Sequence, residues 1–180
     1  MSVHVVSGDL FESNAQTLVN AVNCMGVAGK GIALDFKRRF PEMYQDYAAR
    51  CRRKEVGLGR PYLYRGALLP WVLNFPIKHH WRAVSHLDDI ARGLEYLLAH
   101  YQTWGITSLA VPALGCGAGQ LVWQEVAPTL HRCLGQMCIP VSLYGPLDGF
   151  AEPRPLSLKF TQIPARPVDA PGFSHGVMTL

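Results

Sequence analysis

Two glycine-rich segments carry the residue types from which ligand chemistry is expected. Each follows a short apolar run: the first spans residues 20–32 (NAVNCMGVAGKGI) and the second spans residues 111–121 (VPALGCGAGQL). Glycine lets a backbone approach a ligand closely and adopt a positive φ, and amides that converge at the start of a helix bind anions. The two segments therefore predict one elongated ligand whose phosphate-bearing middle is held from both sides.

Three polar side chains nearby have the chemistry of a reactive site. Asn20 and Asn23 carry amides that both donate and accept hydrogen bonds, which suits a ligand hydroxyl or a catalytic water, although a structural role fits Asn20 equally well. Lys78 follows the nearly uncharged run 74–77 (NFPI). Burial lowers the pKa of a lysine and makes its amine more nucleophilic. Lys78 is thus a candidate nucleophile, general acid or electrostatic stabiliser, with an ordinary exposed lysine as the structural alternative.

The elements that must position these residues alternate along the chain. Apolar runs predict strands at 3–7, 18–22, 62–64, 71–74, 108–112 and 139–144, and helical periodicity predicts helices at 32–40, 41–53, 87–101 and 122–134. Such alternation predicts an α/β fold with helices on both faces of a sheet. Ligands of these folds lie beyond the carboxyl ends of the strands, which is where both glycine-rich segments fall.

Length and composition limit the remaining possibilities. The 180 residues, 49% of them hydrophobic, fit one globular domain, which we place at 1–150; residues 151–180 contain five of the 13 prolines and are predicted to be a linker or tail. The absence of an 18-residue apolar run predicts that the chain has no membrane partner. An odd number of cysteines (five) and no signal-peptide pattern at the start predict a cytoplasmic protein. No spacing predicts a metal site or another cofactor.

Basic residues are concentrated in one part of the chain. Residues 30–82 contain 12 Lys and Arg against 4 Asp and Glu, although the whole chain carries a formal charge of only +4. This surplus is typical of a solvated helix face, and equally of a surface that attracts a polyanion such as nucleic acid. Composition does not separate the two interpretations.

Two common phosphate-binding motifs are excluded by their spacing. A Walker A loop needs a glycine five residues before its Gly-Lys pair and Ser or Thr after it, whereas this chain has Cys24 before Gly29-Lys30 and Gly31 after it. A dinucleotide fingerprint needs GxGxxG in the first strand–helix turn, whereas the second segment has the spacing GxGxG and comes late. A third class of phosphate-binding fold is therefore required.

Four separate pieces, in the correct order, resemble the macrodomain family. They are 6–10 (VSGDL), 20–23 (NAVN), 29–33 (GKGIA) and 112–117 (PALGCG), and the resemblance covers about residues 2–150. It implies a three-layer α/β/α sandwich with a central mixed sheet, and ADP-ribose as the ligand.

The resemblance also implies how that ligand is held. Asp9 would accept a hydrogen bond from adenine, Asn23 would face the distal ribose, and the glycine amides would bind the two phosphates. An N-cap aspartate and an ordinary strand-end tyrosine are the structural alternatives for Asp9 and Tyr144. The implied ligand-binding set is Asp9, Leu10, Asn20, Asn23, Gly26, Gly29, Lys30, Gly31, Ile32, Pro112, Leu114, Gly115, Cys116, Gly117, Ala118, Gly119 and Tyr144.

Within the family, segments 29–37 (GKGIALDFK) and 74–82 (NFPIKHHWR) most resemble the DarG group of DNA ADP-ribosyl glycohydrolases. This resemblance implies an enzyme that removes ADP-ribose from DNA bases, thymine in single strands above all, and so reverses a DarT-like toxin. Lys78 and Asn23 would be catalytic, with Lys78 attacking C1″ of the distal ribose to form a lysyl adduct. Trp81 and Arg82 would contact the nucleic acid, although Trp81 also fits a cap on the core. DarG antitoxins carry a toxin-binding domain downstream, so a DarT-like toxin is a further expected partner.

One departure bears on the substrate. Glycohydrolases of protein-linked ADP-ribose carry an aspartate two residues after their Gly-Cys-Gly, and this chain has Gly119 there. The DarG group shares this lack, which favours a DNA target and leaves the general base unassigned. His79 and His80 are nearby candidates, with phosphate or solvent contact as the alternative. A non-catalytic ADP-ribose reader and a hydrolase of protein-linked or small ADP-ribose derivatives remain the alternative functions.

Overall fold

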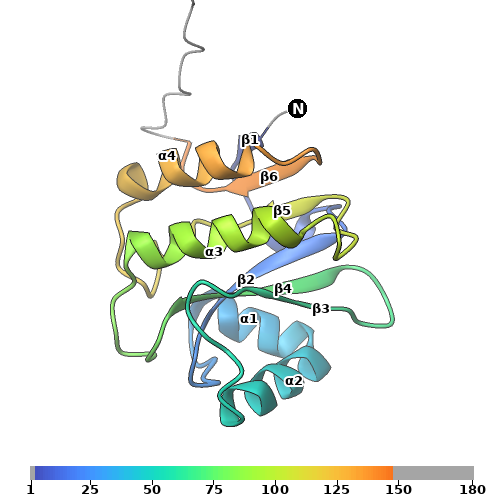
Figure 1. Cartoon of the computed structure of the whole chain (residues 1–180), viewed down its shortest axis with the longest axis vertical. Coiled ribbons are helices and arrows are strands. Elements are labelled where there is room, and N and C mark those ends of the chain that lie inside the picture. The colour runs from blue at the N-terminus through green and yellow to red at the C-terminus, as the bar shows by residue number, and fades with distance from the viewer. Residues whose placement is uncertain (1–2, 148–180) are drawn as a thin grey trace, which may run out of the picture.

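A six-stranded sheet forms the centre of the domain in the computed structural model, which describes residues 3–147 (Figure 1). The strands are β1 (Val3–Val6), β2 (Thr17–Asn23), β3 (Tyr62–Tyr64), β4 (Trp71–Lys78), β5 (Leu109–Val111) and β6 (Val141–Tyr144). Their order across the sheet is β1-β6-β5-β2-β4-β3, and every neighbouring pair is parallel except the antiparallel pair β3–β4. The sheet is therefore mixed, with its parallel strands ending at one common edge.

Helices cover both faces of this sheet. They are the 3-10 helix η1 (Leu10–Glu12) and the α-helices α1 (Gly31–Arg39), α2 (Pro41–Arg52), α3 (Leu87–His100) and α4 (Trp123–Leu134). In Figure 1, α3 and α4 lie side by side in front of the sheet, and α1 and α2 lie at the lower end of the view. Pro41 occupies the first turn of α2, where a missing N–H costs no helical hydrogen bond, so the chain turns there from α1 into α2.

Side chains of β2 alternate between two cores. Val19 belongs to the cluster under α3 and α4, whereas Leu18 and Val22 belong to the cluster under α1 and α2. A strand sends successive side chains to opposite faces, so one apolar strand in the middle of the sheet serves both layers. The predicted three-layer α/β/α sandwich with a central mixed sheet is confirmed.

The fourth strand differs from its prediction. The sequence predicts a strand that ends at residue 74, before Pro76, whereas β4 continues to Lys78. Phe75 and Ile77 are buried, and β4 pairs with β2 along its whole length, with a bulge between Val22 and Asn23. Burial and pairing therefore outweigh the proline, and the extension carries Lys78 to the edge where β2 ends.

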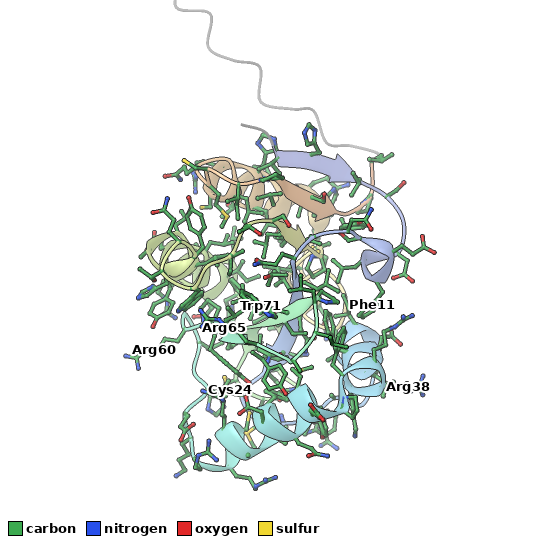
Figure 2. The ribbon with its side chains drawn as sticks, turned by 90° about the vertical axis from the view of Figure 1, so that its right-hand side faces the viewer. Phe11, Cys24, Arg38, Arg60, Arg65 and Trp71 are labelled. Atoms are coloured by element: carbon green, nitrogen blue, oxygen red, sulfur yellow. The ribbon has the colours of Figure 1, made fainter. Side chains whose placement is uncertain are left out.

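Several basic side chains of segment 30–82 lie against aromatic rings, while Arg38 and Arg60 point away from the domain (Figure 2). The ring contacts are Lys37 on Tyr44, Arg39 on Phe11, Arg50 on Tyr62, Arg65 on Trp71 and Arg82 on Trp81, at 4.3–5.2 Å from the ring centroids. Cation–π contacts of this kind stabilise the packing of side chains at the surface. Five of the 12 basic side chains of this segment are therefore held against aromatic rings, and a nucleic-acid role for the basic surplus stays a prediction.

The predicted tail at 151–180 lies outside the described residues, so its boundary stays a prediction.

None of the helices in residues 3–147 combines the length and the apolar character that crossing a membrane requires.

Candidate functional site

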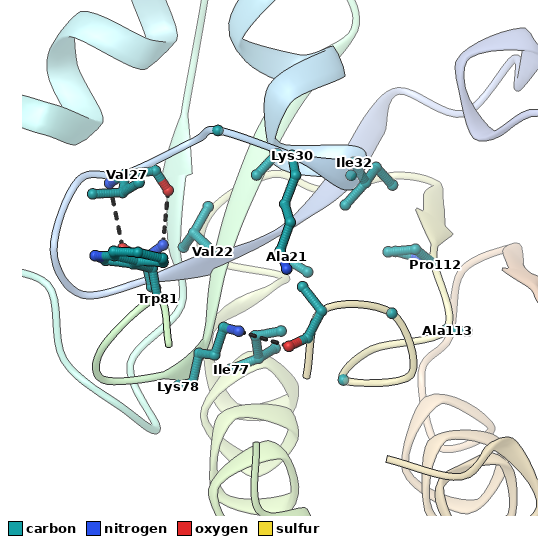
Figure 3. A pocket seen from close by; sticks show the side chains of 17 residues that line it. Ala21, Val22, Val27, Lys30, Ile32, Ile77, Lys78, Trp81, Pro112 and Ala113 are labelled. Carbon is teal, nitrogen blue, oxygen red and sulfur yellow. Dashed lines mark hydrogen bonds between the residues drawn. The ribbon is translucent and has the colours of Figure 1, made fainter. Parts of the chain in front are cut away.

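The two glycine-rich segments face each other across a cavity. The first leaves β2 and the second leaves β5, and these two strands are parallel neighbours in the sheet. Parallel neighbours end at the same edge, so their following loops must lie side by side. Between them is a cavity of about 520 Å³ (Figure 3). The loops are some ninety residues apart in the sequence, and the order of the strands in the sheet brings them together.

Eleven of the predicted site residues line this cavity: Asn23, Gly29, Lys30, Gly31, Ile32, Lys78, Trp81, Pro112, Gly115, Gly117 and Ala118. Six further lining residues were not predicted: Ala21, Val22, Val27, Ala33, Ile77 and Ala113. These six are small or aliphatic, so no chemical signal in the sequence marks them. Only their positions in or beside the motifs could have suggested them.

Glycine backbones form the open part of the lining. A Cβ atom placed on Gly29, Gly31 or Gly117 would meet no atom within 4 Å, so a ligand reaches these backbones unobstructed. Gly31 (φ +61°) and Gly115 (φ +78°) adopt the left-handed conformation that favours glycine. Lys30, the N-cap of α1, makes no side-chain capping bond, so the first amides of α1 stay available. The geometry is that of an anion site.

Asn23 braces the first loop from within. Its Nδ2 donates to the Val27 carbonyl at 2.7 Å, and its Oδ1 accepts from the Met25 amide at 2.9 Å and from the Tyr47 hydroxyl at 3.1 Å. The side chain lines the cavity, yet its polar atoms are used by the loop. This arrangement gives Asn23 a positioning role, and its catalytic role stays a prediction.

Asn20 lies inside the sheet rather than in the cavity. It is buried, and its Nδ2 donates to Oδ1 of Asn74 on the neighbouring strand at 3.0 Å. Asn74 in turn donates to the sulfur of Met43 at 3.4 Å. The structure therefore favours the structural alternative for Asn20.

Asp9, predicted to bind adenine, lies apart from the cavity lining together with Leu10 and Tyr144 of the predicted ligand-binding set. Asp9 follows β1, is exposed and caps η1 by accepting from the Phe11 amide at 2.9 Å. Leu10 is buried under α1 and α2. Tyr144 ends β6, opposite Val6 of β1. These strands lie on the far side of β5 from β4 and end at the same edge of the sheet, so a role for the three residues in ligand binding stays a prediction.

Three residues of the second loop and one of the first face inward. Leu114 and Gly119 are buried, and Cys116 is half-buried. Gly26 packs on α2, where its added Cβ would lie 3.3 Å from Cβ of Cys51. None of the four lines the cavity as a side chain, so their contribution is to the shape of the two loops.

Lys78 occupies the inner wall at the end of β4. It is paired in register with Asn23 of β2 and is only 6% exposed. Its Nζ donates to the Ala118 carbonyl of the second loop at 2.7 Å, as Figure 3 shows. Burial, followed by the positive charge of Lys30, lowers the pKa of Lys78. The direction of this shift makes the neutral amine that covalent chemistry needs easier to form than on an exposed lysine.

No carboxylate offsets the two lysines. Lys30 extends into the cavity from the start of α1 (Figure 3), and none of the residues found to line the cavity is Asp or Glu. Within residues 3–147, no group of His, Cys, Asp and Glu side chains is arranged to hold a metal ion. A ligand that carries negative charge, such as a diphosphate, would balance the positive charge of the two lysines.

Trp81 lies at the mouth of the cavity and does not cap the core. It is 39% exposed and belongs to the cavity lining. His80 stacks on its ring at 5.5 Å between centroids, and the Arg82 guanidinium lies 4.5 Å from the ring. His79 is exposed and its carbonyl accepts from the Cys24 amide at 3.0 Å. Neither His79 nor His80 is among the residues that line the cavity, so the general base stays unassigned.

Gly119 has no room for any side chain. A Cβ atom there would lie 2.4 Å from the Gly115 carbonyl oxygen and 2.4 Å from Oγ of Ser85. The Gly119 carbonyl also accepts from the Ser85 amide at 2.9 Å. This packing explains why an aspartate is not accommodated at this position in the present loop.

Comparison with known proteins agrees with this geometry. A sequence model of the Macro domain family matches residues 19–130. A DNA ADP-ribosyl transferase–DNA ADP-ribosyl glycohydrolase fusion protein of Thermosipho africanus is 40% identical over 177 residues, which cover 88% of this chain and 46% of that protein. A DNA ADP-ribosyl glycohydrolase of Thermus aquaticus is 41% identical over 79% of this chain and 41% of its own length. This chain thus spans less than half the length of both relatives.

Two solved structures are also similar. The macrodomain of Thermus aquaticus DarG has a TM-score of 0.75 at 40% identity, over 80% of this chain and 98% of that one. Thermosipho africanus DarTG in complex with ADP-ribose has a TM-score of 0.78 at 40% identity, over 84% of this chain and 43% of that one. With the family match spanning most of the chain and the same fold in both structures, this chain belongs to the Macro domain family.

Proposed function

We propose that this chain is a DarG-like DNA ADP-ribosyl glycohydrolase, which removes ADP-ribose from DNA bases, principally thymine in single strands, and so reverses a DarT-like toxin. The observation that carries the proposal is the placement of Lys78, a buried amine with a lowered pKa, at one end of a phosphate-binding cavity that no carboxylate lines among the described residues. Identity of about 40% to proteins named DNA ADP-ribosyl glycohydrolases supports the same substrate.

In the proposed complex, the diphosphate of ADP-ribose lies between the two loops. Backbone amides of residues 29–31 and 115–119 donate to its oxygens, and Lys30 balances its charge. The adenine lies toward Asp9 and Tyr144, on the β1–β6 side of the sheet, and the distal ribose lies at Lys78 on the β4 side. Asn23 holds the first loop in the shape that this binding requires.

The proposed reaction breaks the N-glycosidic bond between ribose C1″ and the base. The Lys78 amine attacks C1″, a C–N bond to lysine forms, and the bond to the base breaks, with the base taking up the proton that the attacking nitrogen loses. Water then adds at C1″ and displaces the lysine, which regains its free amine and releases ADP-ribose. The lowered pKa of Lys78 supports this nucleophilic role over a purely electrostatic one.

The compartment and partners follow from the same proposal. A DNA substrate and five free cysteines are consistent with a reducing cytoplasm. Binding of a DarT-like toxin would depend on a domain beyond the macrodomain, as expected from the DarG group.

Substitution of Lys78 tests whether the chain is an enzyme. The wild-type chain should release ADP-ribose from a single-stranded oligonucleotide ADP-ribosylated on thymidine, and Lys78→Ala should reduce the rate at least about a hundredfold, because the nucleophile is lost. Released ADP-ribose is measured by chromatography, and ADP-ribose affinity is measured in parallel by calorimetry. Lys37→Ala, which alters an equal charge on α1 outside the cavity lining, is the matched control.

The outcome separates the proposal from its main alternative. Retained ADP-ribose binding with lost release in Lys78→Ala supports the enzyme. Tight ADP-ribose binding by a wild-type chain that releases nothing would instead support a non-catalytic reader.

A further inference from the structure

Two segments beside the cavity carry exposed apolar side chains. These are Met25 (48% exposed) and Val27 (40%) of the first loop, and Trp81 (39%) and Val84 (45%) of the segment after β4. Val27 and Trp81 also line the cavity itself. We call these four residues the apolar rim. Exposed apolar groups gathered at the opening of a binding cavity are typical of a contact surface for a ligand.

Hydrogen bonds hold the two halves of the apolar rim in place. The Cys24 amide donates to the His79 carbonyl at 3.0 Å, which ties the first loop to the segment after β4. Asn23 fixes Val27 through its carbonyl. The Ser85 amide donates to the Gly119 carbonyl at 2.9 Å, which ties the same segment to the second loop. The segments that carry the apolar rim are therefore fixed to each other and to the second loop by hydrogen bonds.

Trp81 of the apolar rim also belongs to a stack of flat groups formed with its two sequence neighbours. The His80 imidazole and the Trp81 indole are inclined by only 27°, with centroids 5.5 Å apart, and the Arg82 guanidinium lies 4.5 Å from the indole centroid. Aromatic faces and guanidinium planes stack on nucleobases without needing a particular sequence. A glutamyl ester or a phosphate has no aromatic ring to add to such a stack.

The position of the rim along the ligand follows from the strand order. The phosphate-binding loops follow β5 and β2, and Lys78 ends β4, the next strand in the sheet. Trp81 comes three residues later. Figure 3 shows Val27, Trp81 and Lys78 at one side of the cavity, and Pro112 and Ala113 at the other. A group bonded to the carbon that Lys78 attacks would therefore emerge against the rim.

We infer that the apolar rim, with the His80–Trp81–Arg82 stack, is the subsite for the leaving nucleobase and selects a flat, uncharged group at this position. The inference rests on the proposed function, since it assumes that Lys78 marks the reacting carbon. It makes Trp81 a specificity-determining residue, which binds the group that distinguishes DNA from protein substrates.

Binding measurements in a Lys78→Ala background test this subsite without turnover. The two ligands are ADP-ribose and a single-stranded oligonucleotide ADP-ribosylated on thymidine. Adding Trp81→Ala should weaken oligonucleotide binding about tenfold, as expected for the loss of one base–aromatic stack, and leave ADP-ribose binding unchanged. Trp81→Phe should restore most of the loss. Leu68→Ser, which alters an 83% exposed leucine at the opposite edge of the sheet, should change neither affinity.

Two results would overturn the inference. Equal weakening of both ligands by Trp81→Ala would show that the indole supports the ADP-ribose pocket and does not bind a base. Unchanged affinity for both would show that the base does not contact the rim. Turnover by chains with Lys78 intact separates this inference from the proposed function. If the wild-type chain releases ADP-ribose from DNA, Trp81→Ala should raise KM more than it lowers kcat, and if it does not, the proposed function fails while the binding comparison still decides the subsite.

Discussion

Lys78 combines burial, a cationic neighbour and a single neutral partner, and this combination is costly for an ammonium group. Its Nζ has the Ala118 carbonyl as its hydrogen-bond acceptor, and the positive charge of Lys30 adds to the effect of burial in lowering its pKa. Both burial and the like charge disfavour the protonated form. A residue that reduces folding stability in this way and lines a ligand cavity is a candidate for function on physical grounds.

The cost of Lys78 predicts a pH-dependent effect of its removal. Because its pKa is lower in the folded chain than in the unfolded chain, the unfolded chain binds more protons between the two values, and stability rises with pH across that window. Lys78→Met should therefore raise the Tm at neutral pH, and the gain should shrink as pH approaches the ordinary lysine pKa of about 10.4. Thermal unfolding followed by circular dichroism measures both. A Tm that falls at neutral pH would contradict the lowered pKa.

At the residue scale, the sequence shows which side chains could do chemistry better than it shows which partners those side chains contact in the fold. The uncharged run before Lys78 correctly indicates a desolvated amine. By contrast, Asn20 and Asn23 belong to one motif, and nothing in the sequence shows that Asn20 bonds to Asn74 across the sheet. The hydrogen bonds of Asn23 with Val27 and Tyr47 depend on the folded loop and on α2, so the motif does not predict them either.

At the scale of elements, the second loop is shaped by packing between its own ends. Gly119 lies against the Gly115 carbonyl oxygen and Ser85, and Gly115 has a positive φ of 78°. Glycine spacing predicts a loop that binds an anion. It does not predict this closure, because Ser85 comes from a segment more than thirty residues earlier. Similarly, the apolar run at 71–74 does not show that the strand continues through Pro76 to Lys78, because that extension depends on pairing with β2.

A pair of alanine substitutions tests the closure of this loop. Gly119→Ala should destabilise the chain by about 1–3 kcal/mol, because the added methyl group meets backbone atoms that must move. Gly117→Ala is the matched control, since its Cβ would meet no atom within 4 Å, and it should be neutral or slightly stabilising. Urea unfolding measures both. Equal stability of the two variants would contradict the tight packing described at Gly119.

At the scale of the whole molecule, alternation of strands and helices predicts the layers, whereas the strand order comes from the structure alone. That order puts β5, β2 and β4 side by side and so aligns two loops and Lys78 along one edge. No local pattern contains this information, because sequence alternation is compatible with several orders of parallel strands. The site is therefore a property of the sheet, although each of its motifs is local.

The predicted domain boundary can be tested at the same scale. The last described element, β6, ends at Tyr144 and pairs with both β1 and β5. A chain shortened to residues 1–150 should keep the Tm and the ADP-ribose affinity of the full chain, measured by thermal unfolding and calorimetry. A clear loss of either would place part of the domain in residues 151–180.

The most direct measurement is the ratio of two initial rates for the wild-type chain: ADP-ribose release from a thymidine-linked single-stranded oligonucleotide and from a glutamate-linked protein. A cavity that no carboxylate lines among residues 3–147, with no room for a side chain at Gly119 and with Trp81 at its mouth, predicts rapid release from the oligonucleotide and little from the protein. Preferential release from the protein would contradict the central claim that this macrodomain acts on DNA.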